Sequence, residues 1–310
     1  MGAFHCPIGA IGYDAQGCIN CGMCIANTKE ERISASELIR NYLKENASLR
    51  VDRTIKKIAI CGKGGAGKST VTALLAMAFE SFGYKVLVID ADDSNMGLFR
   101  KIGTAKQPKQ IYNIEVDDED SWTKIDPLSI AQIPKEYVER NGNISVVEIG
   151  KILNPFQGCA CSPMQLARNL VLNLDPKDDE IVIADQEAGL ESFGRGVEQG
   201  CDTILTIVEP SFESIEMANT MQYMAEGFGI QRVRAVVSKV EDEDEAEIII
   251  DELSDRDIRY LGVLKKDKSI SKANLMGKNL KETSGLEMVK DLAKLLLDEA
   301  EMKIFNNSGG

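Results

Sequence analysis

The chain lacks several features that would place it in particular protein classes. It has no apolar run approaching the roughly 18 residues that a membrane-spanning helix needs. Its N-terminus has no basic stretch followed by an apolar core, which a secretory signal peptide would show. Positive charge is also scarce, since 36 lysines and arginines stand against 49 aspartates and glutamates, for a formal net charge of −13. We therefore expect a cytoplasmic protein that binds neither membranes nor nucleic acid.

Histidine is almost missing, because His5 is the only one among 310 residues. We expect it to be a hydrogen-bonding neighbour of Cys6 rather than a metal ligand. Cysteine, by contrast, occurs eight times. In a cytoplasmic protein, cysteines rarely form disulfides, so this number indicates metal binding or redox chemistry. Two isolated cysteines, Cys61 and Cys201, are interpreted as buried small hydrophobic residues.

Four N-terminal cysteines resemble half of a bacterial two-cluster ferredoxin. Cys18, Cys21 and Cys24 form a C-x2-C-x2-C run, and upstream of it Cys6 is followed by proline. Such a run holds a 4Fe–4S cluster together with a remote Cys-Pro. The cysteine that would serve a second cluster is absent after Cys24, so the resemblance implies one 4Fe–4S cluster on these four residues. Zinc is the alternative, although four-cysteine zinc sites typically use two paired knuckles.

The most specific motif follows the apolar stretch Lys57–Ile60. Residues 61–70 contain the pattern G-x-x-x-x-G-K-S/T, which ends in Lys68 and Ser69 and is followed by Thr70. Its glycines let backbone N–H groups surround phosphates, its lysine reaches the β- and γ-phosphates, and its serine can ligate Mg²⁺. The next residues are apolar at helical spacing, so the loop should open a helix whose dipole favours phosphate. The predicted nucleotide-binding residues of this loop are Gly64, Gly65, Ala66, Gly67, Lys68, Ser69 and Thr70.

A second lysine, Lys63, lies near the start of the loop. In this respect the loop resembles the deviant phosphate-loop ATPases. That family includes the nitrogenase iron protein, the plasmid-partition and division-site ATPases, and metallocentre-assembly ATPases. Its early lysine reaches across a dimer interface to the partner's nucleotide. The resemblance implies a homodimer that closes on ATP and hydrolyses it to ADP, with Lys63 and Lys68 as catalytic residues.

Two apolar stretches end in acidic residues that would complete such a site. One leads to Asp90 and Asp92, and the other leads to Asp185. By the same resemblance, Asp92 is the catalytic aspartate of switch I, which positions the attacking water, and Asp90 supports the magnesium region. Asp185 fits a Walker B residue that holds Mg²⁺ together with Ser69. Gly189 matches the switch II glycine that senses the γ-phosphate.

Strand-like and helical segments alternate from residue 56 onward. This alternation predicts an α/β fold of the P-loop NTPase type, with a mostly parallel sheet and helices on both faces. The expected strands are Lys57–Cys61, Lys85–Asp90, Ile144–Glu148, Glu180–Asp185, Asp202–Val208, Arg232–Val237 and Tyr260–Val263. The expected helices include Lys68–Phe82, Pro163–Leu174, Phe212–Gly227, Glu245–Leu253 and Leu286–Met302. The expected domains are a small ferredoxin-like iron–sulfur module at 1–33, a helical linker at 34–55, the ATPase domain at 56–305 and a tail at 306–310. Residues 103–143 are irregular and receive no assignment.

Cys159 and Cys161 form a Cys-x-Cys pair just before Pro163, where a helix is expected to begin. Thiols at a helix N-terminus have a lowered pKa and bind metals well. Two thiols cannot fill a tetrahedral site, but a twofold dimer supplies four. The pair matches the metal-binding Cys-x-Cys of the nickel-insertion accessory ATPases of carbon monoxide dehydrogenase, which residues 188–196 and 209–211 also resemble. The resemblance implies nickel, zinc or a second cluster bridging the dimer, and reduced structural thiols are the alternative.

Two functions follow from these motifs. The first is an ATP-driven maturation factor that inserts nickel or remodels a metallocluster in a client metalloenzyme such as carbon monoxide dehydrogenase. The second is an ATP-dependent iron–sulfur reductase like the nitrogenase iron protein. The tight Cys-x-Cys favours the first, because the nitrogenase iron protein holds its bridging cluster with two well-separated cysteines per subunit. A binding-only switch protein, such as a partition ATPase, is a third class, for which the chain lacks a basic surface or a membrane-targeting tail.

Adenine recognition has no evident residue in the sequence. Relatives often carry asparagine after the strand that corresponds to Arg232–Val237. Ser238 and Lys239 occupy that place here. Specificity for ATP is therefore implied by the resemblance alone.

Overall fold

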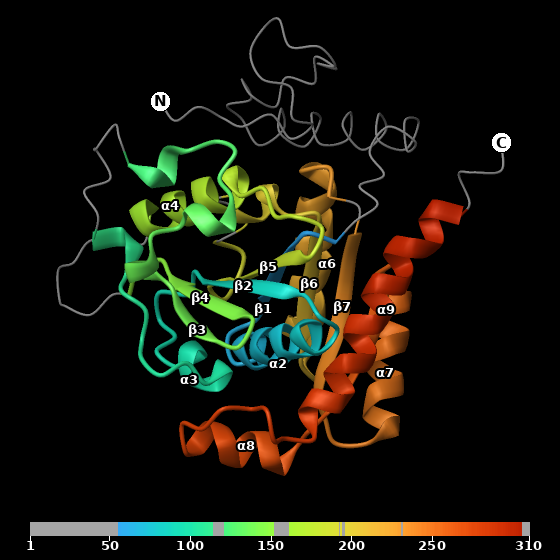
Figure 1. Ribbon diagram of the computed structural model, residues 1–310. Helices are drawn as coiled ribbons and strands as arrows, with labels where there is room; N and C mark the ends of the chain where they lie inside the picture. The colour runs from blue at the N-terminus through green and yellow to red at the C-terminus, as the bar shows by residue number, and fades with distance from the viewer. Residues whose placement is uncertain are drawn as a thin grey trace, which may run out of the picture.

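The computed structural model describes residues 55–113, 121–151, 161–191, 193, 196–230 and 232–305 (Figure 1). The predicted iron–sulfur module, nearly all of the predicted linker, the tail and Cys159 lie outside these residues. The structure therefore bears on the predicted ATPase domain.

A sheet of eight strands runs through the described part of the chain, in the order β3-β4-β2-β5-β1-β6-β7-β8. Neighbouring strands are parallel, except that β3 and β4 are antiparallel. The strand β1 lies inside the sheet between β5 and β6, so the carboxyl ends of these strands meet at one edge. The strands are β1 (Lys57–Gly62), β2 (Lys85–Asp90), β3 (Glu139–Asn141), β4 (Ile144–Glu148), β5 (Glu180–Asp185), β6 (Thr203–Val208), β7 (Arg232–Val240) and β8 (Tyr260–Lys265).

Helices cover both faces of this sheet (Figure 1). On one face α2, α3, α8 and α9 share a hydrophobic core with the strands, and on the other face α4, α6 and α7 do so. The inner strands β1, β2, β5 and β6 are buried on both sides along nearly their whole length, which explains their nearly continuous apolar sequences. The helices are α2 (Lys68–Ser81), α3 (Leu98–Ile102), α4 (Cys161–Asn173), α6 (Phe212–Gly227), α7 (Glu243–Ser254), α8 (Lys268–Leu275) and α9 (Gly285–Phe305).

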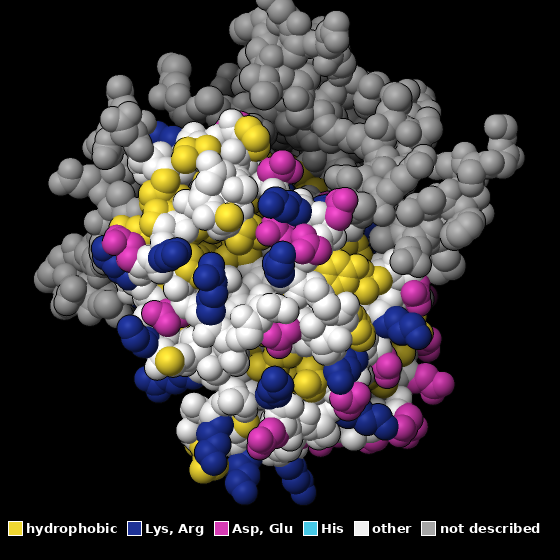
Figure 2. All heavy atoms as spheres, in the orientation of Figure 1, with side chains coloured by type: hydrophobic (Ala, Val, Ile, Leu, Met, Phe, Trp, Pro, Cys, Tyr) yellow, Lys and Arg dark blue, Asp and Glu magenta, His cyan; other side chains and the backbone are white. Residues whose placement is uncertain are grey.

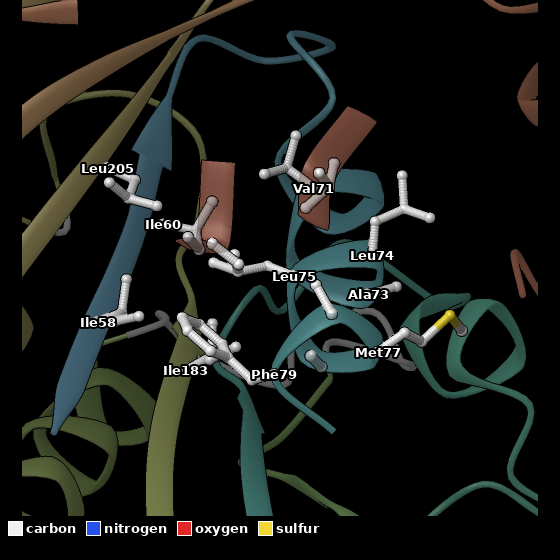
Figure 3. Close-up of a cluster of buried hydrophobic side chains, with 14 of the residues drawn as sticks. Ile58, Ile60, Val71, Ala73, Leu74, Leu75, Met77, Phe79, Ile183 and Leu205 are labelled. Atoms are coloured by element: carbon white, nitrogen blue, oxygen red, sulfur yellow. The ribbon is translucent and has the colours of Figure 1, made fainter. Parts of the chain in front are cut away.

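The helix α2 is anchored to the sheet by its apolar side chains. Figure 3 shows Leu75 and Phe79 on the side of α2 that faces Ile58 and Ile60 of β1, and all four are buried. Burial of each such side chain contributes roughly 1.5–3 kcal/mol relative to exposure. This packing holds the N-terminus of α2, and the loop before it, against the carboxyl ends of the strands.

The predicted α/β fold with a mostly parallel sheet is confirmed, and all seven expected strands are present. The unassigned stretch 103–143 contains the edge strand β3 and four 3-10 helices, η1 (Ile111–Asn113), η2 (Trp122–Lys124), η3 (Ile130–Gln132) and η4 (Lys135–Tyr137), and the short helix α3 just before it was not predicted either. Elements of three to five residues show too few periods for an apolar pattern to appear. Helix α8 was also missed, and α4 begins at Cys161 rather than Pro163, because proline is tolerated in the first helical turn.

The face in Figure 2 mixes lysine and arginine with aspartate and glutamate, and its hydrophobic side chains form small groups among them. Within the described residues, no helix combines the length and the apolar character needed to cross a bilayer. Helices α4, α6, α7, α8 and α9 instead mix apolar and charged residues, which suits helices that pack on one side and face water on the other.

Candidate nucleotide-binding site

The predicted phosphate loop lies between the end of β1 and the start of α2. It begins at Gly62, whose φ is 141° and where an added Cβ would lie 2.5 Å from the Ile207 carbonyl oxygen on β6. Glycine is therefore required both by the backbone and by the neighbouring strand. The loop ends at Gly67, the N-cap of α2, which has a φ of 107°. No side chain caps this helix, so the first-turn N–H groups have no side-chain acceptor and are suited to binding an anion.

Internal hydrogen bonds hold the loop in its curved shape. The Lys63 carbonyl accepts from the Ala66 N–H at 3.2 Å, and the Gly67 carbonyl accepts from the N–H groups of Thr70 and Val71 at 3.0 Å each. Lys68 is buried, and its Nζ lies 3.5 Å from the Lys63 carbonyl. The ammonium thus folds back over the loop.

Asp185 ends β5 beside the loop and is fully buried. Its Oδ1 accepts from the Thr72 hydroxyl at 3.1 Å, whereas its Oδ2 is buried with no hydrogen-bond partner among the described residues. Burial raises the pKa of Asp185 to about 6, and the nearby Asp92 carboxylate adds to the rise, while Ser69 lowers it. A carboxylate oxygen without a partner, close to the Ser69 hydroxyl, is a donor set that suits Mg²⁺.

Asp92 is buried just after β2 and is held by its own turn. Its Oδ1 accepts from the Ser94 N–H at 2.9 Å, the Ser94 hydroxyl at 2.6 Å and the Asn95 N–H at 3.2 Å. The Asn95 amide donates to the Ser69 hydroxyl at 2.5 Å. The turn that carries Asp92 is therefore tied directly to the phosphate loop.

A buried ion pair lies behind this turn, and the sequence reasoning missed its cation. Lys151 has no exposed side-chain surface, and its Nζ lies 2.8 Å from Asp90 Oδ1 and 3.7 Å from Glu148 Oε1. The same Nζ donates to the Asp92 carbonyl. Burial raises the pKa of Asp90, and the Lys151 ammonium opposes that rise and favours the carboxylate. The sequence singled out residues 150–152 only as part of the resemblance to the accessory ATPases, and nothing in it indicated that Lys151 is buried or paired with Asp90.

Lys63 contacts side chains of its own chain at the start of α6. Its Nζ lies 3.3 Å from the Ser211 hydroxyl, 3.4 Å from Glu209 Oε1 and 3.9 Å from Glu213 Oε2. About a third of its side chain is exposed. The predicted contact with a partner's nucleotide is not tested by a single chain.

Two residues at the end of β7 also support the loop, and neither was predicted to do so. The Ser238 hydroxyl donates to the Ala66 carbonyl at 2.7 Å. Lys239 Nζ donates to the Gly65 carbonyl and lies 3.3 Å from Glu209 Oε2. Lys239 has a φ of 63°, a backbone conformation that favours glycine. A residue held in this way usually serves a local function.

A cavity of about 520 Å³ adjoins the phosphate loop on the side of α8 and α9. Its lining combines apolar side chains, including Val71 and Leu74, with charged ones, including Lys239, Lys266 and Asp267. This volume and mixture fall in the range of small-ligand pockets. Sequence reasoning could not identify this cavity, because its walls come from distant parts of the chain.

Gly189, the predicted switch II glycine, lies next to the loop. Its φ is 94°, and its N–H donates to the Gly62 carbonyl at 3.3 Å. The structure therefore brings the loop, Asp92, Asp185 and Gly189 to one edge of the sheet. Their assigned roles in catalysis and nucleotide binding remain predictions.

The predicted metal-binding cysteines fall largely outside the described residues. This applies to Cys6, Cys18, Cys21, Cys24 and Cys159, whereas Cys161 is the first residue of α4. Among the side chains that the structure does describe, no three histidine, cysteine or acidic residues group closely enough to hold a metal ion.

Cys61 and Cys201 are buried, as predicted, and burial raises the pKa of both thiols. A buried thiol with a raised pKa is poorly reactive. These two residues therefore belong to the core rather than to a metal or redox site.

Proteins similar to this chain include uncharacterized ATP-binding proteins, a carbon monoxide dehydrogenase accessory protein and a nitrogenase iron protein. An uncharacterized ATP-binding protein of Methanocaldococcus jannaschii is 38% identical over 252 residues, which cover 77% of this chain and 99% of the relative. The carbon monoxide dehydrogenase accessory protein CooC of Rhodospirillum rubrum is 29% identical over 246 residues, 71% of this chain and 88% of its own length. Nitrogenase iron protein 2 of Paenibacillus durus is 25% identical over 272 residues, 81% and 87% of the two chains.

Among solved structures, the septum site-determining protein MinD of Pyrococcus horikoshii, complexed with Mg-ADP, superposes with a TM-score of 0.61 at 17% identity. The match covers 81% of this chain and 99% of MinD. At this identity the likeness establishes the fold alone. Residues 57–280 match the family described as the CobQ/CobB/MinD/ParA nucleotide binding domain. The chain belongs to this family of P-loop nucleotide-binding proteins.

Proposed function

We propose that the protein is a dimeric, ATP-hydrolysing metallocentre maturation factor. The observation that carries the ATPase part is the meeting of Lys68, Asp92 and Asp185 at the carboxyl edge of the sheet, around an uncapped helix N-terminus. The loop N–H groups and Lys68 would bind the triphosphate, and the adjoining cavity would take the nucleoside.

Ser69 and Asp185 would hold the magnesium ion, which neutralises charge on the phosphates. Asp92 would orient the attacking water, and the Gly189 N–H would exchange its Gly62 carbonyl for the γ-phosphate. The residues of this chain thus act by positioning and by electrostatic stabilisation, which is what phosphoryl transfer requires.

The proposed dimer depends on Lys63, which would contact the nucleotide of the partner subunit. Its side chain is about a third exposed, and its ion pairs with Glu209 and Glu213 are reached by water and stabilise the fold by about 0–1 kcal/mol each. These contacts are weak enough to be exchanged for a partner's nucleotide. The deviant phosphate loop supports the same arrangement.

The cargo would bind at Cys159 and Cys161. Two subunits related by a twofold axis would contribute four thiolates, enough for one nickel or zinc ion or one cluster. The likeness to CooC supports this assignment, and a client similar to carbon monoxide dehydrogenase follows from it. ATP would close the interface that holds the metal, and hydrolysis would open it for release.

A titration of nickel or zinc with ATP and with ADP tests this assignment. We expect one metal ion per dimer, bound more tightly in one nucleotide state, and lost in the double variant Cys159→Ser/Cys161→Ser, which should still bind ATP. Equal metal affinity of the wild type and the double variant, with ATP and with ADP, would show that Cys159 and Cys161 do not bind the cargo metal.

An ATP-dependent iron–sulfur reductase is the second candidate. It is favoured by the N-terminal C-x2-C-x2-C run with Cys6, and by the likeness to a nitrogenase iron protein. Protein purified without oxygen should carry four irons per chain, and Cys21→Ser should abolish their absorption while ATP still binds. Nucleotide-dependent electron donation from this cluster, together with no metal binding at Cys159 and Cys161, would establish the reductase. Stoichiometric zinc without iron would exclude it.

A further inference from the structure

Both backbone polar groups of Asp92 are held by one ion pair. The Asp92 N–H donates to Asp90 Oδ1 at 3.3 Å, and the Asp92 carbonyl accepts from Lys151 Nζ. Asp90 Oδ1 and Lys151 Nζ are themselves 2.8 Å apart. The peptide groups on either side of the Asp92 Cα are therefore fixed by a single carboxylate–ammonium pair, which sets the direction in which the Asp92 side chain leaves the backbone.

The ion pair is anchored in two strands that flank the turn. Asp90 ends β2, Glu148 ends the neighbouring strand β4, and the two are register partners. Glu148 accepts hydrogen bonds from the Gln107 amide on both oxygens, at 3.0 and 2.9 Å. Lys151 is thus surrounded by groups that cannot move independently of the sheet.

Such a pair is a costly way to stabilise a fold. Removing an ammonium and carboxylates from water offsets much of their attraction, so apolar residues of similar size often stabilise a core equally well. The most direct effect of the ion pair is to fix the position of Asp92. Lys151 donates to the Asp92 carbonyl, and the proposed mechanism needs the Asp92 carboxylate in a fixed place.

We propose that Lys151 is a positioning residue for hydrolysis, acting through the backbone of Asp92. The proposal rests on the proposed catalytic role of Asp92. Without the ammonium, the Asp92 carbonyl loses its donor and the carboxylate can turn away from the attacking water. The bonds described above join Lys151 to Asp90, Asp92 and Glu148, whereas the proposed nucleotide binding uses the phosphate loop and the adjoining cavity.

The test compares turnover with nucleotide affinity. Because Lys151→Met alone leaves buried carboxylates without their cation, we also use Lys151→Met/Glu148→Gln, which removes one charge of each sign and keeps a partner for Gln107. We expect kcat to fall about 10- to 100-fold, the effect of misplacing a reacting group by about 1 Å. The Kd for ATP should stay within about threefold of the wild type. An unchanged kcat in the charge-compensated variant overturns the proposal.

Two control variants distinguish a loss of Asp92 positioning from a general loss of stability. Glu148→Gln alone keeps Lys151 and its bond to Asp92, so its kcat should remain near the wild-type value. Lys57→Met removes a partly buried lysine, which donates to the carbonyls of Val171 and Leu172 at the opposite edge of the sheet. It should lower the melting temperature without changing kcat. A fall in kcat equal to that of the charge-compensated variant in either control contradicts the proposal.

A double-mutant cycle shows whether the effect passes through Asp92. In an Asp92→Asn background, residual hydrolysis is followed over hours by the release of labelled phosphate. Adding Lys151→Met/Glu148→Gln should then cause no further loss, because the residue that Lys151 positions no longer acts. A further loss as large as in the wild-type background overturns the positioning role. Wild-type turnover in Asp92→Asn itself would instead overturn the catalytic role of Asp92 in the proposed function.

Discussion

Gly62 is the residue at which backbone geometry leaves the least freedom. A Cβ there would lie 2.5 Å from a backbone oxygen of β6, an atom that cannot move without disturbing the sheet. We predict that Gly62→Ala lowers both the free energy of unfolding and nucleotide affinity. Gly83 is a matched control, since its φ is 95° but an added Cβ would contact nothing within 4 Å. Gly83→Ala should cost only about 1–2 kcal/mol.

The comparison of these two variants by denaturant unfolding isolates the steric contact. The loss of stability for Gly62→Ala should exceed that for Gly83→Ala, and only Gly62→Ala should weaken nucleotide binding. Equal losses would mean that the neighbouring strand does not restrict residue 62.

At the residue scale, substitutions of Lys68 and Asp92 distinguish ATP binding from ATP turnover. Lys68→Ala should lower ATP affinity at least about tenfold, because a buried charge-assisted contact with phosphate is lost. Asp92→Ala should bind ATP nearly normally and lose about 100-fold or more in turnover. Isothermal titration and phosphate release measure the two quantities. Wild-type turnover of Asp92→Ala would exclude its catalytic role.

At the scale of elements, two aspartates that cap helices allow an effect on stability to be separated from an effect on nucleotide binding. Asp267 caps α8 by accepting from the Ser269 N–H at 2.6 Å, and it also lines the cavity. Asp242 caps α7 by accepting from the Glu245 N–H at 2.9 Å, and it does not line the cavity. Each Asp→Ala variant should cost about 1 kcal/mol of stability.

Only Asp267→Ala should also weaken nucleotide binding, by about tenfold, because the wall of the proposed nucleoside pocket shifts with the start of α8. Thermal unfolding and ATP titration of the two variants make the comparison. If both variants bind ATP like the wild type, the nucleoside lies elsewhere.

At the scale of the whole molecule, the proposed dimer places Lys63 in the partner's site. A Lys63→Ala subunit mixed with a Lys68→Ala subunit forms one composite site with both lysines and one with neither. Hydrolysis by the mixture should therefore exceed that of either homodimeric variant. A Lys63→Ala homodimer with full activity would show that the lysine does not act in this way.

The sequence by itself determined the parts of the protein that are written in consecutive residues. The strands are apolar runs because a covered parallel sheet buries both faces, and the phosphate loop follows β1 because its chemistry needs a strand, glycines and a helix in that order. Acidic residues at strand ends also identify one edge of the sheet before any coordinates exist. The short elements between residues 103 and 143 escaped prediction, since tertiary packing rather than periodicity defines them.

Only the tertiary structure decided which distant residues support that edge. Lys151 reaches Asp92 across 59 residues, and Lys239 reaches Gly65 across 174. A lysine has no sequence signature for burial, because its partners are chosen by strand order and not by spacing along the chain. The cavity beside the loop arises for the same reason: it exists only where β7, α8 and α9 are brought to the start of α2.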